Sequence, residues 1–107
     1  MEENDLTKVA MQIILHAGDA RLKLTEALNA AKQFKFDEAQ SLFNEANDAI
    51  TLAHKSQTEV IQSEASGQEY EFSLLFAHAQ DTLMTINSEI RMTQQMIDIL
   101  KIIAEKR

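Results

Sequence analysis

Apolar residues recur at alternating steps of three and four along almost the whole chain, and no proline interrupts them. Such spacing places the apolar side chains on one face of an α-helix. Only two glycines occur, Gly18 and Gly67, so few positions favour an end to helix. The pattern predicts an all-α fold in which three helices, at about residues 3–32, 36–66 and 70–104, form an antiparallel bundle. The 107 residues are expected to form one helical domain, residues 1–107.

The first two predicted helices carry one apolar stripe each. The stripe of the first helix consists of Leu6, Val9, Ile13, Ala17, Ala20, Leu24, Ala27 and Ala31. The stripe of the second helix consists of Phe36, Ala39, Phe43, Ala46, Ile50, Ala53, Gln57 and Val60. Gly67 follows the second helix, where glycine commonly adopts the left-handed conformation that ends a helix. The start of the second helix is poorly marked, because Gln33-Phe34-Lys35 offers no Ser, Thr, Asp or Asn as a cap.

Gly18 lies inside the first predicted helix rather than at an end. Glycine in a helix interior costs about 1 kcal/mol relative to alanine. That cost favours a close contact with another helix at Gly18, and a tolerated defect is the alternative.

The third predicted helix carries two stripes. The core stripe consists of Phe72, Phe76, Ala79, Leu83, Ile86, Ile90, Thr93, Ile97 and Leu100. The second stripe consists of Leu74, His78, Asp81, Thr85, Ser88, Met92, Gln95, Ile99 and Ile103. The offset of two residues corresponds to ~200° around a helix, so the stripes face opposite ways. Two helices on one side cannot cover both, and the exposed apolar residues of the second stripe predict a homo-oligomer built through the third helix.

The charge and composition exclude several classes of partner. A formal net charge of −7 argues against nucleic acid, whose phosphates need Lys and Arg clusters, and against an anionic membrane surface. No apolar run approaches ~18 residues, so no membrane insertion is expected. The chain has no cysteine, which removes disulfides, thiolate nucleophiles and sulfur metal sites from consideration. We expect a cytoplasmic protein.

His78 and Asp81 lie three residues apart in a stretch without glycine or proline. In a helix this spacing points an imidazole and a carboxylate toward the same face of a rigid element. An ordinary imidazole is largely neutral at cytoplasmic pH, so His78 is a candidate nucleophile toward phosphorus. General-base catalysis is the alternative, although a thin bundle offers no obvious substrate pocket. A lone pair of this kind is more often a surface contact, so these residues by themselves leave the choice open.

The other titratable candidates have competing interpretations. His16 adjoins an apolar run and His54 follows Leu52-Ala53, so a structural or surface role is favoured for both. Asp81 is either a solvated carboxylate or a residue whose copies meet on an axis lined by the third helix. Clustered carboxylates need protons or a cation, and oxygen ligands suit Mg²⁺.

Several runs of residues resemble the lactose/cellobiose-type IIA component of the bacterial phosphoenolpyruvate-dependent sugar phosphotransferase system. The similarity covers nearly everything from Met11 to about Ile103. Its most specific part is His78-Ala79-Gln80-Asp81, preceded by Ser73-Leu74-Leu75 and followed by Leu83-Met84-Thr85. The remaining runs are Ala17-Gly18-Asp19-Ala20-Arg21, Glu26-Ala27-Leu28, Ala53-His54-Lys55-Ser56-Gln57-Thr58 and Ile61-Gln62-Ser63-Glu64-Ala65.

The resemblance implies a trimer of three-helix subunits, nine helices in all, with the third helix lining the axis. It implies a phosphotransferase component that accepts phosphate from the carrier HPr on His78 and passes it to a IIB component during disaccharide uptake. It also implies that Asp81 supplies an axial Mg²⁺ site, with one carboxylate from each subunit. Gln80 matches a family position beside the phosphorylated ring, which implies a phosphate contact.

One position departs from the family. A second histidine commonly follows the aspartate there, whereas this chain has Thr82, whose hydroxyl donates a hydrogen bond but does not titrate. A helical adaptor or oligomerisation module without chemistry is the alternative function, because heptads and an exposed stripe suit it equally. The sequence does not identify the sugar, and cellobiose, chitobiose and lactose remain open.

Overall fold

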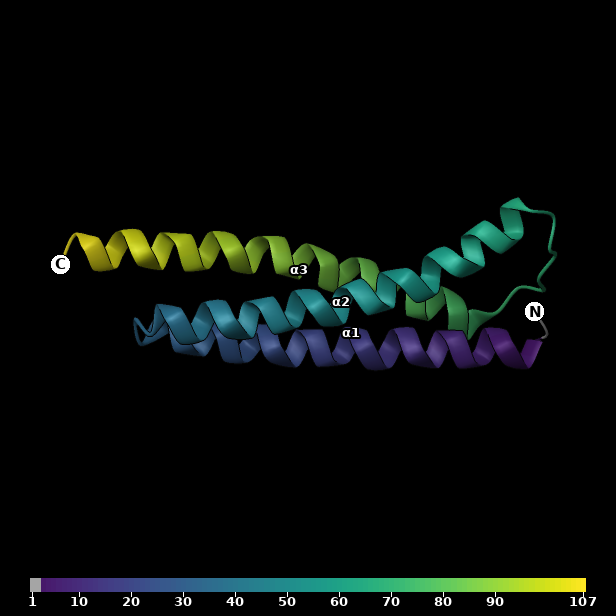
Figure 1. Ribbon diagram of the computed structural model, residues 1–107, viewed down its shortest axis with the longest axis horizontal. Helices are drawn as coiled ribbons and strands as arrows, with labels where there is room; N and C mark the ends of the chain where they lie inside the picture. The colour runs from purple at the N-terminus through teal and green to yellow at the C-terminus, as the bar shows by residue number, and fades with distance from the viewer. Residues whose placement is uncertain (1–2) are drawn as a thin grey trace.

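The computed structural model describes residues 3–107, which form three α-helices and no strand. The helices are α1 (Glu3–Lys32), α2 (Phe36–Ala65) and α3 (Leu74–Glu105). In Figure 1, α1 and α3 run in one direction and α2 runs in the other, so the predicted antiparallel arrangement of three helices is confirmed. The chain folds into a rod of 58 × 19 × 19 Å, longer than the ~45–48 Å that a helix of 30 to 32 residues spans at ~1.5 Å rise per residue.

The predicted stripes form the core. Every stripe residue of the first two helices is buried except Val9 and Phe36, which are half-buried. Most of the buried positions in α1 and α2 are alanines, and small side chains let two helix axes approach closely. The bulk of the core comes from larger side chains, of which Ile13, Val60, Leu83, Ile86 and Ile97 are the largest that are fully buried.

The connection between α1 and α2 has an unusual backbone. Phe34 adopts φ 60°, in the left-handed region that non-glycine residues seldom occupy. Its ring stacks on Phe36 with centroids 5.8 Å apart, and the Arg107 guanidinium lies 4.9 Å from the Phe34 ring centroid. Lys35 stands at the cap position of α2 and its side chain makes no capping hydrogen bond. At the start of α2, which the sequence marks poorly, the structure therefore has aromatic contacts and no side-chain cap.

The helix α3 begins at Leu74, four residues later than predicted. Its cap is Ser73, whose Oγ accepts a hydrogen bond from the backbone N–H of Phe76 at 3.1 Å. Phe72 consequently lies outside the helix and is 85% exposed, so its assignment to the core stripe was wrong. Because the serine side chain accepts an otherwise unpaired N–H of the first turn, it favours a helix that begins directly after Ser73.

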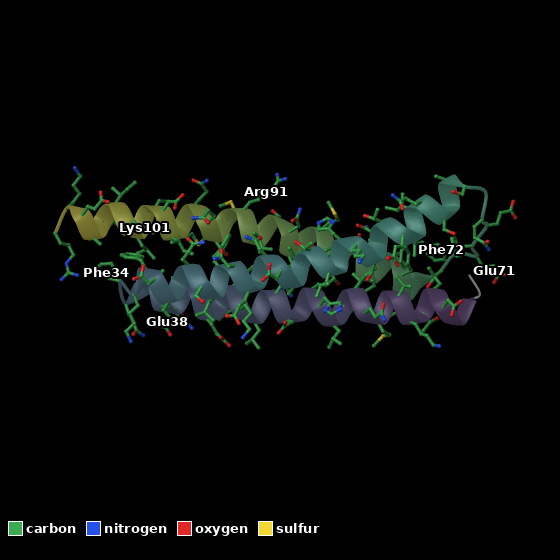
Figure 2. All side chains as sticks on the ribbon, viewed as in Figure 1. Phe34, Glu38, Glu71, Phe72, Arg91 and Lys101 are labelled. Carbon is green, nitrogen blue, oxygen red and sulfur yellow. The ribbon has the colours of Figure 1, made fainter. Side chains whose placement is uncertain are left out.

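The connection from α2 to α3 returns the chain to the start of α1. The last turns of α2 bend away from α1 before residues 66–73 come back (Figure 1). Gly67 has φ 105°, which confirms its predicted role as a left-handed terminator of α2. The Tyr70 hydroxyl donates to Ser63 Oγ at 2.8 Å and ties the connection to α2. Figure 2 shows Glu71 and Phe72 at this end of the rod and Phe34 toward the other.

Gly18 makes no close contact within the subunit. A Cβ added at Gly18 would meet no atom within 4 Å, and the residue is exposed. The close contact expected between Gly18 and another helix is therefore not made by the helices of this chain. Across residues 3–107, no helix is long and apolar enough to cross a membrane.

Candidate functional site

The second stripe of α3 is exposed along its whole length. All nine of its residues are exposed, and Leu74, Met92, Ile99 and Ile103 have 75%, 55%, 54% and 48% of their surface accessible. The opposite stripe of the same helix is buried from Ala79 to Ile97. This confirms that a single subunit leaves an apolar stripe uncovered, with His78 and Asp81 among its members.

His78 stands in the second turn of α3 with its side chain exposed. Its imidazole makes no hydrogen bond or ion pair within residues 3–107, so Asp81 does not orient the ring inside one subunit. Its backbone carbonyl oxygen accepts a hydrogen bond from Thr82 Oγ1 at 2.8 Å. A free imidazole fixed to a rigid helix is accessible to a reacting partner from solvent.

Asp81 is exposed and lies one turn beyond His78 on the same stripe. Among the described residues, no group of three or more His, Cys, Asp or Glu side chains could hold a metal ion. Mg²⁺ is surrounded by six oxygens, and a single exposed carboxylate would leave nearly all of them to water and hold the ion weakly. The residue fits a magnesium site only where carboxylates from several subunits converge, and its oxygen chemistry is suited to that ion.

Gln80 faces a different way from His78. It is half-buried and lines a cavity of about 180 Å³ together with Leu6, Val60 and Phe76. Two residues of separation correspond to ~200° around the helix, so Gln80 points toward α2 while His78 points outward. The structure does not bring Gln80 and His78 together within one subunit.

The remaining histidines are both half-buried. Asp19 stands three residues after His16, the same spacing as between His78 and Asp81. The spacing to an aspartate is therefore the same for His16 and His78 and does not single out either of them. What distinguishes His78 is that its side chain is exposed and lies on the second stripe.

One interaction beside the second stripe escaped the sequence analysis. Arg21 of α1 forms two hydrogen bonds with the Glu89 carboxylate of α3, both 2.9 Å long. The hydrogen bond with Glu89 raises the pKa of Arg21, and the negative charge of Glu89 acts in the same direction. The two partners are 68 positions apart in the sequence, so no local sequence pattern predicts this ion pair.

This ion pair lines an open groove between α1 and α3. The groove has a volume of about 290 Å³ and is lined also by Leu28, Met92 and Met96. It adjoins the second stripe through Met92. The uncovered apolar surface therefore extends from α3 onto α1.

Comparison with known proteins places the chain among phosphotransferase components. The family described as the lactose/cellobiose-specific IIA subunit of the PTS system matches residues 8–101. The lactose-specific EIIA component of Staphylococcus epidermidis is 41% identical over 101 residues, which cover 94% of this chain and 97% of that protein. The lichenan-specific IIA component of Bacillus subtilis is 38% identical over 96% of this chain and 94% of its own length.

The fold has a close counterpart among solved structures. The crystal structure of the cellobiose-specific enzyme IIA of Bacillus anthracis superposes with a TM-score of 0.92 at 40% sequence identity. The superposition covers 100% of this chain and 96% of that one.

Proposed function

Because the chain belongs to the lactose/cellobiose-specific IIA family of the phosphotransferase system, we propose that it carries phosphate on His78. HPr donates the phosphoryl group and a IIB component accepts it, in the cytoplasm, during uptake of a disaccharide of the cellobiose, chitobiose or lactose type. A nitrogen of the His78 ring attacks phosphorus, the N–P bond forms, and the bond between phosphorus and HPr breaks. The reverse displacement by the IIB component restores the free imidazole.

The observation that carries this proposal is the accessibility of His78. It is the one exposed histidine of residues 3–107, and its ring is free of hydrogen bonds there. A nucleophile that must meet two different proteins in turn has to be reached from outside. The rigid helix fixes its direction, so neither partner has to order a loop before transfer.

We propose further that three copies assemble through the apolar residues of the second stripe and leave the His78 ring reachable from solvent at the edge of their interface. The exposed Leu74, Met92, Ile99 and Ile103 need a cover, and an identical stripe from another copy matches their spacing. In such a trimer of nine helices, α3 lines the axis and the three Asp81 carboxylates converge. One Mg²⁺ ion shared by them would offset the repulsion among their charges.

The decisive experiment is phosphorylation with defined components. The protein is incubated with phosphoenolpyruvate, enzyme I and HPr, and its intact mass is measured. We expect one phosphoryl group per chain through a bond that acid cleaves and alkali spares. An unchanged mass under conditions in which HPr itself is phosphorylated would refute the carrier function.

A helical adaptor without chemistry is the alternative. An adaptor has no need for an imidazole and a carboxylate on an interface, where apolar residues pack better. The two functions are separated by measuring both properties. An adaptor would form oligomers by light scattering without accepting phosphate by intact mass, whereas the proposed carrier does both.

A further inference from the structure

The Thr82 hydroxyl is the polar group that the structure places beside the His78 backbone. Thr82 is half-buried, and its Oγ1 donates to the carbonyl oxygen of His78 at 2.8 Å. Both residues lie inside α3, where the carbonyl of one residue normally accepts the backbone N–H four positions later. A carbonyl oxygen has two lone pairs, so the hydroxyl fills the second. If the hydroxyl turned away, the His78 carbonyl oxygen would therefore still accept its backbone hydrogen bond.

The geometry of the helix directs this hydroxyl toward the His78 side chain. A residue four positions on lies about 40° further round the helix and one turn up, on nearly the same face. Helical side chains lean toward the N-terminus, so the Thr82 side chain leans over the turn that carries His78. Threonine populates two rotamers in helices, one of which bonds a carbonyl of the preceding turn. Rotation of the O–H bond about the Cβ–Oγ1 bond can also turn the hydrogen away from that carbonyl.

Phosphorylation creates a need for such a donor. The phosphoryl group adds negative charge and strong acceptor oxygens to a ring that has no hydrogen-bond partner within residues 3–107. Asp81, exposed one turn away, carries charge of the same sign. Gln80 cannot serve within its own subunit, because it lines the cavity on the side of α2.

We propose that Thr82 binds the phosphoryl group of phosphorylated His78, with its hydroxyl turning from the His78 carbonyl oxygen to a phosphoryl oxygen. This inference rests on the proposed function and adds a residue to it. No covalent bond changes in the step, and the hydrogen stays on Oγ1. The contact exists only after transfer from HPr, so it stabilises the phosphorylated protein relative to the free one and draws the phosphoryl group toward His78.

The test is the equilibrium of phosphate between this protein and HPr. Equal amounts of the phosphorylated protein and unphosphorylated HPr are mixed, left to equilibrate and quenched in alkali. Intact masses then give the four concentrations. Four proteins are compared: the parent, Thr82→Val, which keeps the shape without the hydroxyl, Thr82→Ser, which keeps the hydroxyl, and Thr51→Val. Thr51 is the matched control, because its Oγ1 also donates to the carbonyl oxygen four residues earlier, that of Asn47 at 2.8 Å, but on α2.

We expect Thr82→Val to shift the equilibrium about tenfold toward phosphorylated HPr, the size of effect seen when a hydrogen bond to a charged acceptor is lost. Thr82→Ser should restore it to within about twofold of the parent, and Thr51→Val should match the parent. An unchanged constant in Thr82→Val would overturn the inference. A loss that Thr82→Ser does not recover would also overturn it, because the methyl group and not the hydroxyl would then matter. A parent protein that takes no phosphate would refute the carrier function itself, which is a separate result.

Discussion

The two stripes of α3 have the same heptad spacing, but one is buried and the other is exposed. From Ala79 to Ile97, the core stripe is buried against α1 and α2. The second stripe is exposed throughout and mixes apolar residues with His78, Asp81, Thr85 and Ser88. An apolar residue is tolerated on both faces, but only the exposed face can carry groups that must meet another molecule. Heptad spacing therefore indicates which residues share a face, while burial decides whether that face stabilises the subunit or serves contacts outside it.

The largest effect is expected from His78→Gln, which should abolish phosphate uptake. Glutamine fits a helix and keeps polarity but has no ring nitrogen to attack phosphorus. His16→Gln and His54→Gln are the controls and should each still take one phosphoryl group per chain by intact mass. Full phosphorylation of the His78→Gln protein would show that another residue accepts the phosphate. The second stripe would then differ from the core stripe in exposure and not in chemistry.

A core substitution should cost far more stability than its counterpart on the second stripe. Ile86 is fully buried, so Ile86→Ala should lower the free energy of unfolding by about 2–5 kcal/mol in urea titrations. Ile99→Ala removes the same atoms from a side chain that is 54% exposed. We expect that variant to act mainly on assembly, with a smaller trimer fraction by light scattering at low protein concentration. Equal losses of stability in dilute monomer would contradict the distinction.

Asp81→Leu tests whether the second stripe forms an axis. If three carboxylates converge there, replacing them with leucine should preserve or raise the unfolding temperature of the trimer, because clustered charge is removed and apolar contact is gained. Added Mg²⁺ should stabilise the parent and not the variant. A large loss of stability in Asp81→Leu, together with no response of the parent to Mg²⁺, would argue against an axial cluster.

The start of α3 should depend on one side chain. Ser73→Ala removes the oxygen that accepts the Phe76 N–H and should lower the free energy of unfolding by about 1 kcal/mol. Ser41→Ala, at an exposed position inside α2, is the matched control and should have a much smaller effect. Because His78 lies in the following turn, hydrogen exchange at residues 76–79 should accelerate in Ser73→Ala alone.

The smallest effect is expected at Gly18. Alanine there meets nothing within 4 Å in the subunit, so Gly18→Ala should stabilise α1 by about 0.5–1 kcal/mol. Gly67→Ala is the contrasting variant and should destabilise the protein, since φ 105° disfavours an alanine. A Gly18→Ala protein that is less stable only as an oligomer would show that another copy approaches α1 at this point.

Much of the fold was predictable because it depends on local rules. Spacing by three and four identified the buried faces, and Gly67 marked the end of α2 through its backbone freedom. The start of α3 was misplaced, because the extended segment 70–73 has no signature stronger than the apolar pattern that runs through it. Phe72 continued the heptad in the sequence and yet lies in solvent, since Ser73 is the N-cap and the helix begins only at Leu74.

For the candidate site too, some features follow from local sequence and others only from the tertiary structure. The sequence by itself determined that His78 and Asp81 share a face of α3, because three residues span nearly one helical turn. Only the tertiary structure decided that Gln80 lines a cavity on the side of α2 and that Arg21 reaches Glu89. Each of these depends on how helices distant in the chain are placed against one another. Periodicity acts over a few residues and fixes a direction around one helix axis, whereas the packing of three axes fixes what lies in that direction.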